Sequence, residues 1–156
     1  MKKQSAGLLL YRSQKDSFEI LLVHPGGPFW KNRDNGAWSI PKGEYADDED
    51  PLDAAIRETE EEIGKRVDGQ FFELSPVKLK SGKVIHAWAV NAEYDPDTLH
   101  SNFFQMEWPP GSGRNQSFPE VDRAAWFSFE DAKKKINSGQ IPLIVQLENM
   151  APSFYS

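Results

Sequence analysis

Two short hydrophobic runs near the N-terminus are separated by a polar segment. Residues 5–12 (SAGLLLYR) and 17–24 (SFEILLVH) are rich in leucine, isoleucine and valine, whereas residues 13–16 are polar. Apolar runs of this length, bounded by turn residues, are typical of β-strands, so the pattern predicts a β-hairpin. A third short strand is expected at residues 37–41 (AWSIP), after a glycine- and proline-rich segment at 25–36.

The hydrophobic pattern then changes to that of a helix. Asp50 is expected to cap the first turn with its side chain, and Pro51 suits the first helical position. Gly64 predicts the end of the helix. Between these ends one narrow stripe recurs at helical spacing, formed by Leu52, Ala55, Ile56, Thr59 and Ile63. We expect this stripe to be the buried face of the helix.

The second half of the chain predicts further strands followed by helices. The expected elements are two long strands within residues 69–95, joined at 81–83, a strand at 103–109, a polar loop at 110–120, a strand at 123–129, a helix at 130–136 capped by Ser128, and a last helix opened by Pro142 at 142–150. Strands on both sides of one strong helix, with more helix near the C-terminus, predict a mixed α/β (α+β) sandwich.

Composition predicts one globular domain that spans residues 1–156. Hydrophobic residues make up 38% and charged residues 27% of the chain, which is typical of a folded protein. The absence of cysteine excludes disulfides and thiolate metal sites and favours a reducing compartment, so we expect a cytoplasmic protein. No stretch approaches the roughly 20 apolar residues of a membrane span. The net charge of −6 argues against broad affinity for nucleic acid, which needs a basic face.

The segment 43–64 is strongly acidic, with ten acidic side chains and one basic side chain. Glu58, Glu61 and Glu62 stand at helical spacings of three and four, so their carboxylates can point into one small volume. Mg²⁺ or Mn²⁺ suits such a volume, because these ions prefer carboxylate oxygens and often bridge to substrate phosphates. The alternatives are a solvated acidic helix face and a calcium-binding module, although the acidic spacing does not fit the EF-hand pattern.

The same segment carries a longer motif. Seven residues stand at its fixed positions: Gly43, Glu49, Arg57, Glu58, Glu61, Glu62 and Gly64. Residues 43–65 thereby resemble the signature of the Nudix hydrolases, G-x5-E-x7-R-E-U-x-E-E-x-G-U, in which U is an aliphatic residue. Two U positions depart from it, because Thr59 and Lys65 stand there. These departures concern local packing more than chemistry.

The resemblance implies a fold, a metal and a set of roles. The fold is a Nudix-type α/β/α sandwich with a mixed sheet and the signature loop-helix-loop. The cofactor is Mg²⁺ or Mn²⁺, and it lowers the pKa of bound water to make a nucleophile. The implied roles are Glu61 and Glu62 as metal ligands, Glu58 as a further ligand or as the general base, the Gly43 carbonyl in the metal shell, Glu49 as an outer ligand and Arg57 as the residue that orients a glutamate.

Members of the family differ in the position of the base, and some place it in a late loop. Glu120 is the loop candidate here, and Glu107 is the second. Each also has an ordinary interpretation, because Glu120 could be a turn acid and Glu107 an exposed strand residue. The three histidines, His24, His86 and His100, are scattered along the chain, and none is assigned to the metal.

Several residues are candidates for substrate binding. Lys42 precedes Gly43 in the segment WSIPKG, which is similar to the same region of the diadenosine polyphosphate hydrolases in the family, and its ammonium could meet a phosphate. Trp30 is the first candidate for stacking on a base, because its neighbours are polar. Other aromatic candidates are Phe29, Trp38, Phe103, Phe104 and Trp108. Arg33 and Arg114 are expected to hold distal phosphates.

These features predict a metal-dependent pyrophosphohydrolase that acts on dinucleoside polyphosphates (Ap4A-like) or on nucleoside triphosphates, including oxidised ones. ADP-ribose-like sugar nucleotides and RNA 5′ ends are alternative substrates. A catalytically silent nucleotide-binding Nudix module is an alternative of another class. The partner is expected to be a small-molecule nucleotide rather than nucleic acid or a membrane, and both a monomer and a homodimer remain open.

Overall fold

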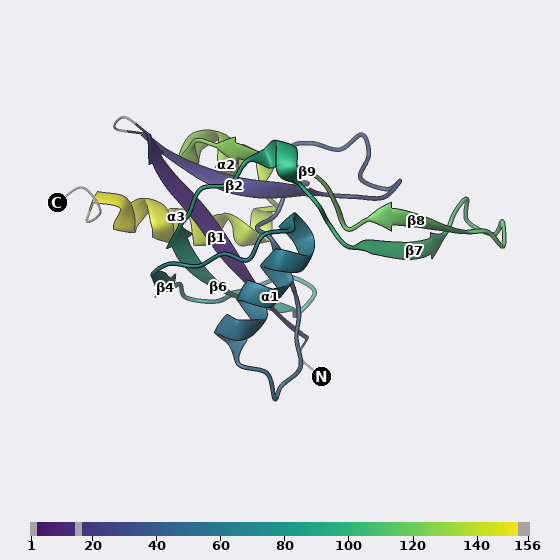
Figure 1. Cartoon of the computed structure of the whole chain (residues 1–156), viewed down its shortest axis with the longest axis horizontal. Helices are drawn as coiled ribbons and strands as arrows, with labels where there is room; N and C mark the ends of the chain where they lie inside the picture. Colours follow the sequence, from purple (N-terminus) through teal and green to yellow (C-terminus); the bar gives the residue numbers. More distant parts are fainter. Residues whose placement is uncertain (1–2, 15–16, 153–156) are drawn as a thin grey trace.

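The computed structural model describes residues 3–14 and 17–152, and its centre is a mixed β-sheet covered by helices on both faces (Figure 1). The strand order along the main path of the sheet is β4-β6-β1-β2-β9. Helix α1 (Pro51–Ile63) packs on one face, and α2 (Phe129–Lys135) and α3 (Ile141–Met150) pack on the other. The expected α/β/α sandwich is confirmed.

Strands β1 (Gln4–Gln14) and β2 (Ser17–Pro25) form the predicted hairpin and lie at the centre of the sheet. Residues 15 and 16 of the expected turn lie outside the described residues. Strand β1 also pairs in parallel with β6 (Val84–Asn91), which makes the sheet mixed. Because helices cover both faces of the sheet at β1, hydrophobic residues are needed on both faces of this strand.

The two faces of β1 bury different cores. Leu8 and Leu10 belong to the core beneath α1, whereas Leu9 and Tyr11 belong to the core beneath α2 and α3. This alternation is the period of two that a strand imposes on its side chains. It explains why residues 6–11 are continuously buried and lack an exposed polar face.

The prediction of a strand at residues 37–41 is wrong. Trp38 and Ser39 form only isolated bridges, and the strand of this region is β3 (Lys42–Glu44), which pairs with β1. The physical reason lies at Pro41, which has no N–H to donate, while its carbonyl accepts a hydrogen bond from the Leu8 N–H at 3.2 Å. Pairing with β1 thereby becomes regular only after the proline.

Two further expectations need correction. The first long strand within residues 69–95 is divided into β4 (Phe71–Glu73) and β5 (Val77–Lys78), because Pro76 interrupts it, and both pieces pair with β6. The loop expected at residues 110–120 contains β8 (Asn115–Pro119), which pairs with β7 (Phe103–Glu107). The β7–β8 hairpin is a second, small sheet that projects from the body of the molecule (Figure 1).

The C-terminal predictions are confirmed. Strand β9 (Val121–Phe127) lies at the edge of the main sheet beside β2, and Ser128 caps α2 by accepting from the Asp131 N–H at 3.1 Å. Helix α3 begins one residue before Pro142. Two short 3-10 helices, η1 (Pro96–Thr98) and η2 (Ser138–Gln140), complete the elements. Within the described residues, no helix has the length and apolar character to cross a membrane.

Candidate active site

Helix α1 presents its acidic side chains from a well-defined position. The Asp50 carboxylate accepts from the Asp53 N–H at 3.0 Å, and Gly64 ends the helix in a left-handed conformation with φ of 79°. The predicted stripe faces the sheet, with Ala55, Ile56 and Ile63 buried and Leu52 half-buried. Thr59 is fully buried as well, so the departure from an aliphatic residue is accommodated in the core.

Arg57 organises the carboxylates of this helix. Its Nε and Nη2 donate to the two carboxylate oxygens of Glu49 at 2.9 and 2.8 Å. Its Nη1 donates to Glu58 at 2.8 Å and to Glu61 at 3.3 Å. The hydrogen bonds from Arg57 lower the pKa of Glu49 and raise the pKa of Arg57 itself. The guanidinium therefore fixes three carboxylates relative to one another.

Glu58 is the buried member of this group and lies against β3. Its carboxylate lies so close to Gly43 that a Cβ at residue 43 would overlap it. Burial, followed by the charge of Glu61, raises the pKa of Glu58 to about 7. The absence of a side chain at Gly43 is thus what allows the carboxylate and the Gly43 backbone to lie side by side.

Glu62 joins α1 to the start of β3. Its Oε1 accepts from the Lys42 backbone N–H at 3.2 Å. Burial raises the pKa of Glu62 to about 8, with smaller contributions from the charges of Glu120 and Glu58, and Lys42 opposes this shift. Lys42, Glu58 and Glu120 therefore act electrostatically on the same carboxylate.

Glu120 is brought to this cluster by the chain between β8 and β9. Its backbone N–H donates to the Asn102 carbonyl at 2.8 Å, and its carbonyl accepts from the Gly26 N–H at 2.9 Å. Burial and the charge of Glu61 raise its pKa, and Lys42 lowers it. The second loop candidate, Glu107, lies elsewhere, because its carboxylate accepts from the Gly111 N–H in the turn of the β7–β8 hairpin.

The donor set suits a hard divalent cation. The cluster offers carboxylate oxygens and a backbone carbonyl, which are the ligands that Mg²⁺ and Mn²⁺ prefer. Within residues 3–14 and 17–152, no three acidic or histidine side chains already converge on one point, because Arg57 and the Lys42 N–H hold the carboxylates. Burial, with a smaller contribution from mutual repulsion, raises the pKa values of Glu58 and Glu62, and a cation among the carboxylates would offset both effects.

Three of the aromatic candidates for base binding, Phe29, Trp30 and Trp38, lie between β2 and β3, and the others belong to the β7–β8 hairpin. Trp30 is 37% exposed, and the Arg33 guanidinium lies 5.6 Å from the centre of its ring. Phe29 is more exposed and meets Trp108 of the hairpin edge to face, with the ring centres 5.4 Å apart. Trp38, by contrast, is buried and donates from Nε1 to Asp34, so it cannot serve as an open platform.

Arg114 does not lie beside the carboxylates. It precedes β8 at the far end of the hairpin, where its carbonyl accepts from the Trp108 N–H. Five residues of extended chain lie between Arg114 and Glu120, so the two are up to about 20 Å apart. The expectation that Arg114 holds a distal phosphate stays a prediction, whereas Lys42 lies next to Glu62 and Glu120.

Sequence reasoning missed the residues that hold Glu120 in place. Asn102 donates from its N–H to the Glu61 carbonyl at 2.9 Å and accepts from the Glu120 N–H, so it links α1 to the loop. The hydroxyl of Ser101 accepts from the Val121 N–H at 3.0 Å. No sequence motif identifies these residues, because Asn102 acts through its backbone groups and Ser101 through its side-chain hydroxyl.

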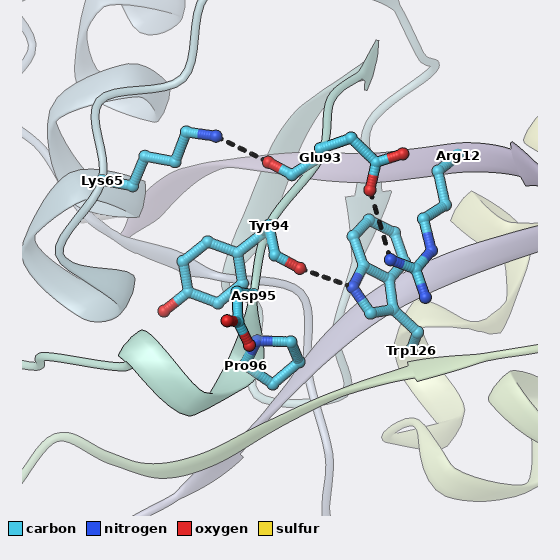
Figure 2. Close-up of a pocket in the computed structure, with 7 residues that line it drawn as sticks. All are labelled: Arg12, Lys65, Glu93, Tyr94, Asp95, Pro96 and Trp126. Carbon is cyan, nitrogen blue, oxygen red and sulfur yellow. Dashed lines mark hydrogen bonds and ion pairs between the residues drawn. The ribbon is translucent and has the colours of Figure 1, made fainter.

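A pocket of about 360 Å³ lies apart from these glutamates (Figure 2). The seven residues that line it are Arg12, Lys65, Glu93, Tyr94, Asp95, Pro96 and Trp126. The Lys65 ammonium donates to the Glu93 carbonyl at 2.6 Å, Arg12 pairs with the Glu93 carboxylate at 3.2 Å, and Trp126 donates to the Tyr94 carbonyl at 2.8 Å. These bonds join the end of α1 to the sheet and explain how a lysine is accommodated at position 65.

The geometry of the acidic helix and the whole fold agree with one known family. The family described as NUDIX domain matches residues 1–147. The chain belongs to the NUDIX domain family. It is a Nudix hydrolase, an enzyme of the phosphoanhydride-cleaving type, and members of the family generally use divalent metal cations.

Solved Nudix structures share the fold at low sequence identity. An Ap4A hydrolase of C. elegans, solved as a binary complex, is 22% identical over 96% of this chain and 98% of its own, with a TM-score of 0.67. The E. coli ORF135 protein is 22% identical over 98% and 94%, with a TM-score of 0.62. The NUDIX domain of Shewanella oneidensis NrtR, solved with ADP ribose, is 16% identical over 100% and 90%, with a TM-score of 0.61.

Proposed function

We propose that this Nudix hydrolase is a metal-dependent pyrophosphohydrolase of the cytoplasm that cleaves dinucleoside polyphosphates or nucleoside triphosphates, including oxidised ones. The observation that carries the proposal is the group of Glu58, Glu61, Glu62 and Glu120, with the cations Arg57 and Lys42 beside it. Carboxylates are poor ligands for a phosphate chain by themselves, so a divalent cation is needed between the two. Lys42 can then meet a phosphate oxygen directly.

Each residue of the cluster has a proposed role. Glu58, Glu61 and Glu62, with the Gly43 carbonyl, would hold Mg²⁺ or Mn²⁺, and this ion would neutralise phosphate charge and activate water. Both carboxylate oxygens of Glu49 already accept from Arg57, which favours an outer position for Glu49. Arg57 orients Glu58 and Glu61.

Two glutamates are candidates for the general base. Burial raises the pKa of both Glu58 and Glu120, which makes each carboxylate a stronger base than an exposed glutamate. Glu58 is tied to Arg57, whereas no side-chain hydrogen bond to Glu120 is found within the described residues. We therefore assign the removal of the water proton to Glu120 and the metal to Glu58.

The loop that carries Trp30 and Arg33 supports a nucleotide with more than one phosphate. An exposed indole can stack on a base, and an arginine beside it can pair with a phosphate distant from the metal. The C. elegans neighbour is an Ap4A hydrolase, which agrees with the first substrate class. The NrtR domain was solved with ADP ribose, so sugar nucleotides are the second candidate.

The test is a product analysis of the pure protein with Mg²⁺ and with Mn²⁺. Diadenosine tetra- and hexaphosphate, nucleoside triphosphates, 8-oxo-dGTP, ADP-ribose and a triphosphate-ended RNA are each incubated, and the products are separated by chromatography. We expect cleavage of the dinucleotides or the triphosphates that EDTA abolishes. Preferential release of AMP and ribose phosphate from ADP-ribose would favour the second class instead, and binding without any cleavage would contradict the proposal.

A further inference from the structure

His24 is a fully buried histidine whose two ring nitrogens both face oxygen acceptors. Nδ1 lies 2.8 Å from the Asp122 carboxylate, and Nε2 lies 2.7 Å from the Arg33 carbonyl. The Arg33 carbonyl can only accept, so Nε2 donates to it, and Nδ1 is bonded to the Asp122 carboxylate. A buried polar ring is costly unless its nitrogens have hydrogen-bond partners, and these two partners satisfy both nitrogens.

Asp122 reaches the ring because of a β-bulge between β2 and β9. His24 is opposite Arg123, but the next residue, Pro25, is opposite Val121, so Asp122 is the additional residue. A bulge turns side chains away from their regular alternation and is frequent beside active sites. Here it directs Asp122 toward His24, two residues after Glu120, which lies among the acidic side chains of the site.

The same region ties down both ends of the substrate-binding loop. The Gly26 N–H donates to the Glu120 carbonyl at 2.9 Å, and the Arg33 carbonyl accepts from His24. Between these two ties, Phe29 and Trp30 are exposed, and the Arg33 guanidinium lies over the ring of Trp30. The position of the loop relative to Glu120 thus depends on two hydrogen bonds, one from the Gly26 N–H and one to the Arg33 carbonyl.

We propose that His24 and Asp122 are a positioning pair that fixes residues 26–33 relative to Glu120, and so sets the distance between the bound nucleotide and the point of hydrolysis. Within the described residues, the pair makes no hydrogen bond or ion pair with Glu58, Glu61, Glu62 or Glu120. Its effect passes through the Arg33 carbonyl and the bulge. This inference rests on the proposed function of the same site, and it adds the residues that determine how the nucleotide is held.

A merely structural pair makes a different prediction. Removing it would destabilise the whole protein and leave the kinetic constants of the folded fraction unchanged. A positioning pair instead changes the KM of the folded enzyme, because the loop no longer holds Trp30 and Arg33 at the correct place. The two roles are therefore separated by kinetics together with the local mobility of the loop.

The experiment compares wild type, Asp122→Ala, Asp122→Asn and His24→Gln, with Glu148→Gln as the matched control. Glu148 forms an ion pair with Lys133 at 2.6 Å between α2 and α3, on the face of the sheet opposite α1, so its loss removes a pair outside the site. Steady-state kinetics on the best dinucleotide or triphosphate substrate give KM and kcat. Hydrogen exchange followed by mass spectrometry reports the mobility of residues 26–36.

We expect Asp122→Ala and His24→Gln to raise KM about tenfold, the order expected when the stacking of one base is weakened. Their kcat should change less than their KM, and exchange should be faster in residues 26–36 but unchanged in α3. Asp122→Asn keeps an acceptor for the His24 Nδ1 and should restore KM toward that of the wild type. Glu148→Gln should leave both readouts unchanged.

An unchanged KM in both Asp122→Ala and His24→Gln, or faster hydrogen exchange throughout the chain, would overturn the positioning role. His24→Gln serves as the second variant where Asp122→Ala does not fold. A wild type that binds nucleotides without cleaving them contradicts the proposed hydrolysis but leaves the pair testable, because the dissociation constant then replaces KM. Equal dissociation constants for wild type and variants would then overturn the positioning role of the pair, independently of the proposed hydrolysis.

Discussion

At the residue scale, the site depends on how its carboxylates are kept apart. Arg57 bonds to Glu49, Glu58 and Glu61, and the Lys42 N–H bonds to Glu62. Each of these four carboxylates is therefore held by at least one donor, although the group as a whole is acidic. The consequence is that single substitutions in this group should affect the reaction far more than the fold.

Glu62→Gln tests the metal ligand. Glutamine keeps the shape and can still accept from the Lys42 N–H, but it lacks the negative charge that binds the cation. We expect turnover to fall by at least about 100-fold while the thermal midpoint stays the same or rises, because a charged group in a repulsive cluster is removed. Kinetics and thermal denaturation provide the measurements.

The matched control for this variant is Glu60→Gln on the same helix. Glu60 is exposed and lies outside the seven fixed positions of the motif, and within the described residues its only ion pair is a long one of 3.9 Å with Arg66. The turnover of the Glu60→Gln variant should equal that of the wild type. A Glu62→Gln protein with wild-type turnover would exclude Glu62 from the metal site.

Trp30→Ala tests the stacking platform. Trp30 is exposed and has Arg33 beside its ring, so its loss should weaken binding of the base without disturbing the core. We expect KM to rise about tenfold with a smaller change in kcat. Val145→Ala is the control, because Val145 is an equally exposed hydrophobic residue on α3. An unchanged KM would place the base elsewhere.

At the element scale, α1 and β3 act as one unit. The carboxylate of Glu58 lies against Gly43, and the carboxylate of Glu62 binds the start of β3. The helix is oriented by its buried stripe, and the strand by its pairing with β1. Their separation is therefore set by the sheet, which leaves no room for a side chain at Gly43.

Gly43→Ala tests this contact. The new methyl group overlaps the Glu58 carboxylate, which must turn away and lose its bond to Arg57. We expect kcat to fall about tenfold or more, whereas stability changes by about 1–3 kcal/mol, the usual cost of overpacking. In a Glu58→Ala background, Gly43→Ala should cause no further loss of rate, since the two residues act together. Additive losses would contradict the contact.

At the scale of the whole molecule, the acidic cluster links stability to pH and to metal. The pKa values of Glu58 and Glu62, about 7 and about 8, lie above the ordinary value of 4.5. At pH values between 4.5 and the raised pKa values, the folded protein holds protons that the unfolded chain has released. The free energy of unfolding of the metal-free protein should therefore fall as the pH rises through this range. Glu49 and Asp34 have lowered pKa values, so they affect the free energy of unfolding only at more acidic pH.

A divalent cation should reverse this trend, because it binds the deprotonated carboxylates of the folded state. We expect Mg²⁺ to stabilise the protein more at about pH 8 than at about pH 5.5, by an amount that grows with its concentration. Urea denaturation with Mg²⁺ and with EDTA, at a series of pH values, measures the difference. Glu62→Gln should reduce it. A metal-free stability that rises between pH 5.5 and pH 8 would contradict the assignment.

The local parts of the prediction were accurate for physical reasons. Asp50, Pro51 and Gly64 define the ends of α1 through their own backbone preferences and through bonds to residues three or four away. The hairpin of β1 and β2 follows from two adjacent apolar runs in the same way. The errors at residues 37–41 and 110–120 arose where a proline or a distant pairing partner decides the conformation.

The sequence by itself determined the acidic helix, its ends and the spacing of Glu58, Glu61 and Glu62, because these depend on contacts within one helix. Only the tertiary structure decided that Glu120 joins them, since it comes from a loop more than fifty residues away along the chain and is held there by backbone bonds to Asn102 and Gly26. The bond between His24 and Asp122 spans 98 positions. Such contacts depend on the twist, order and bulges of the sheet, which local residue patterns do not encode.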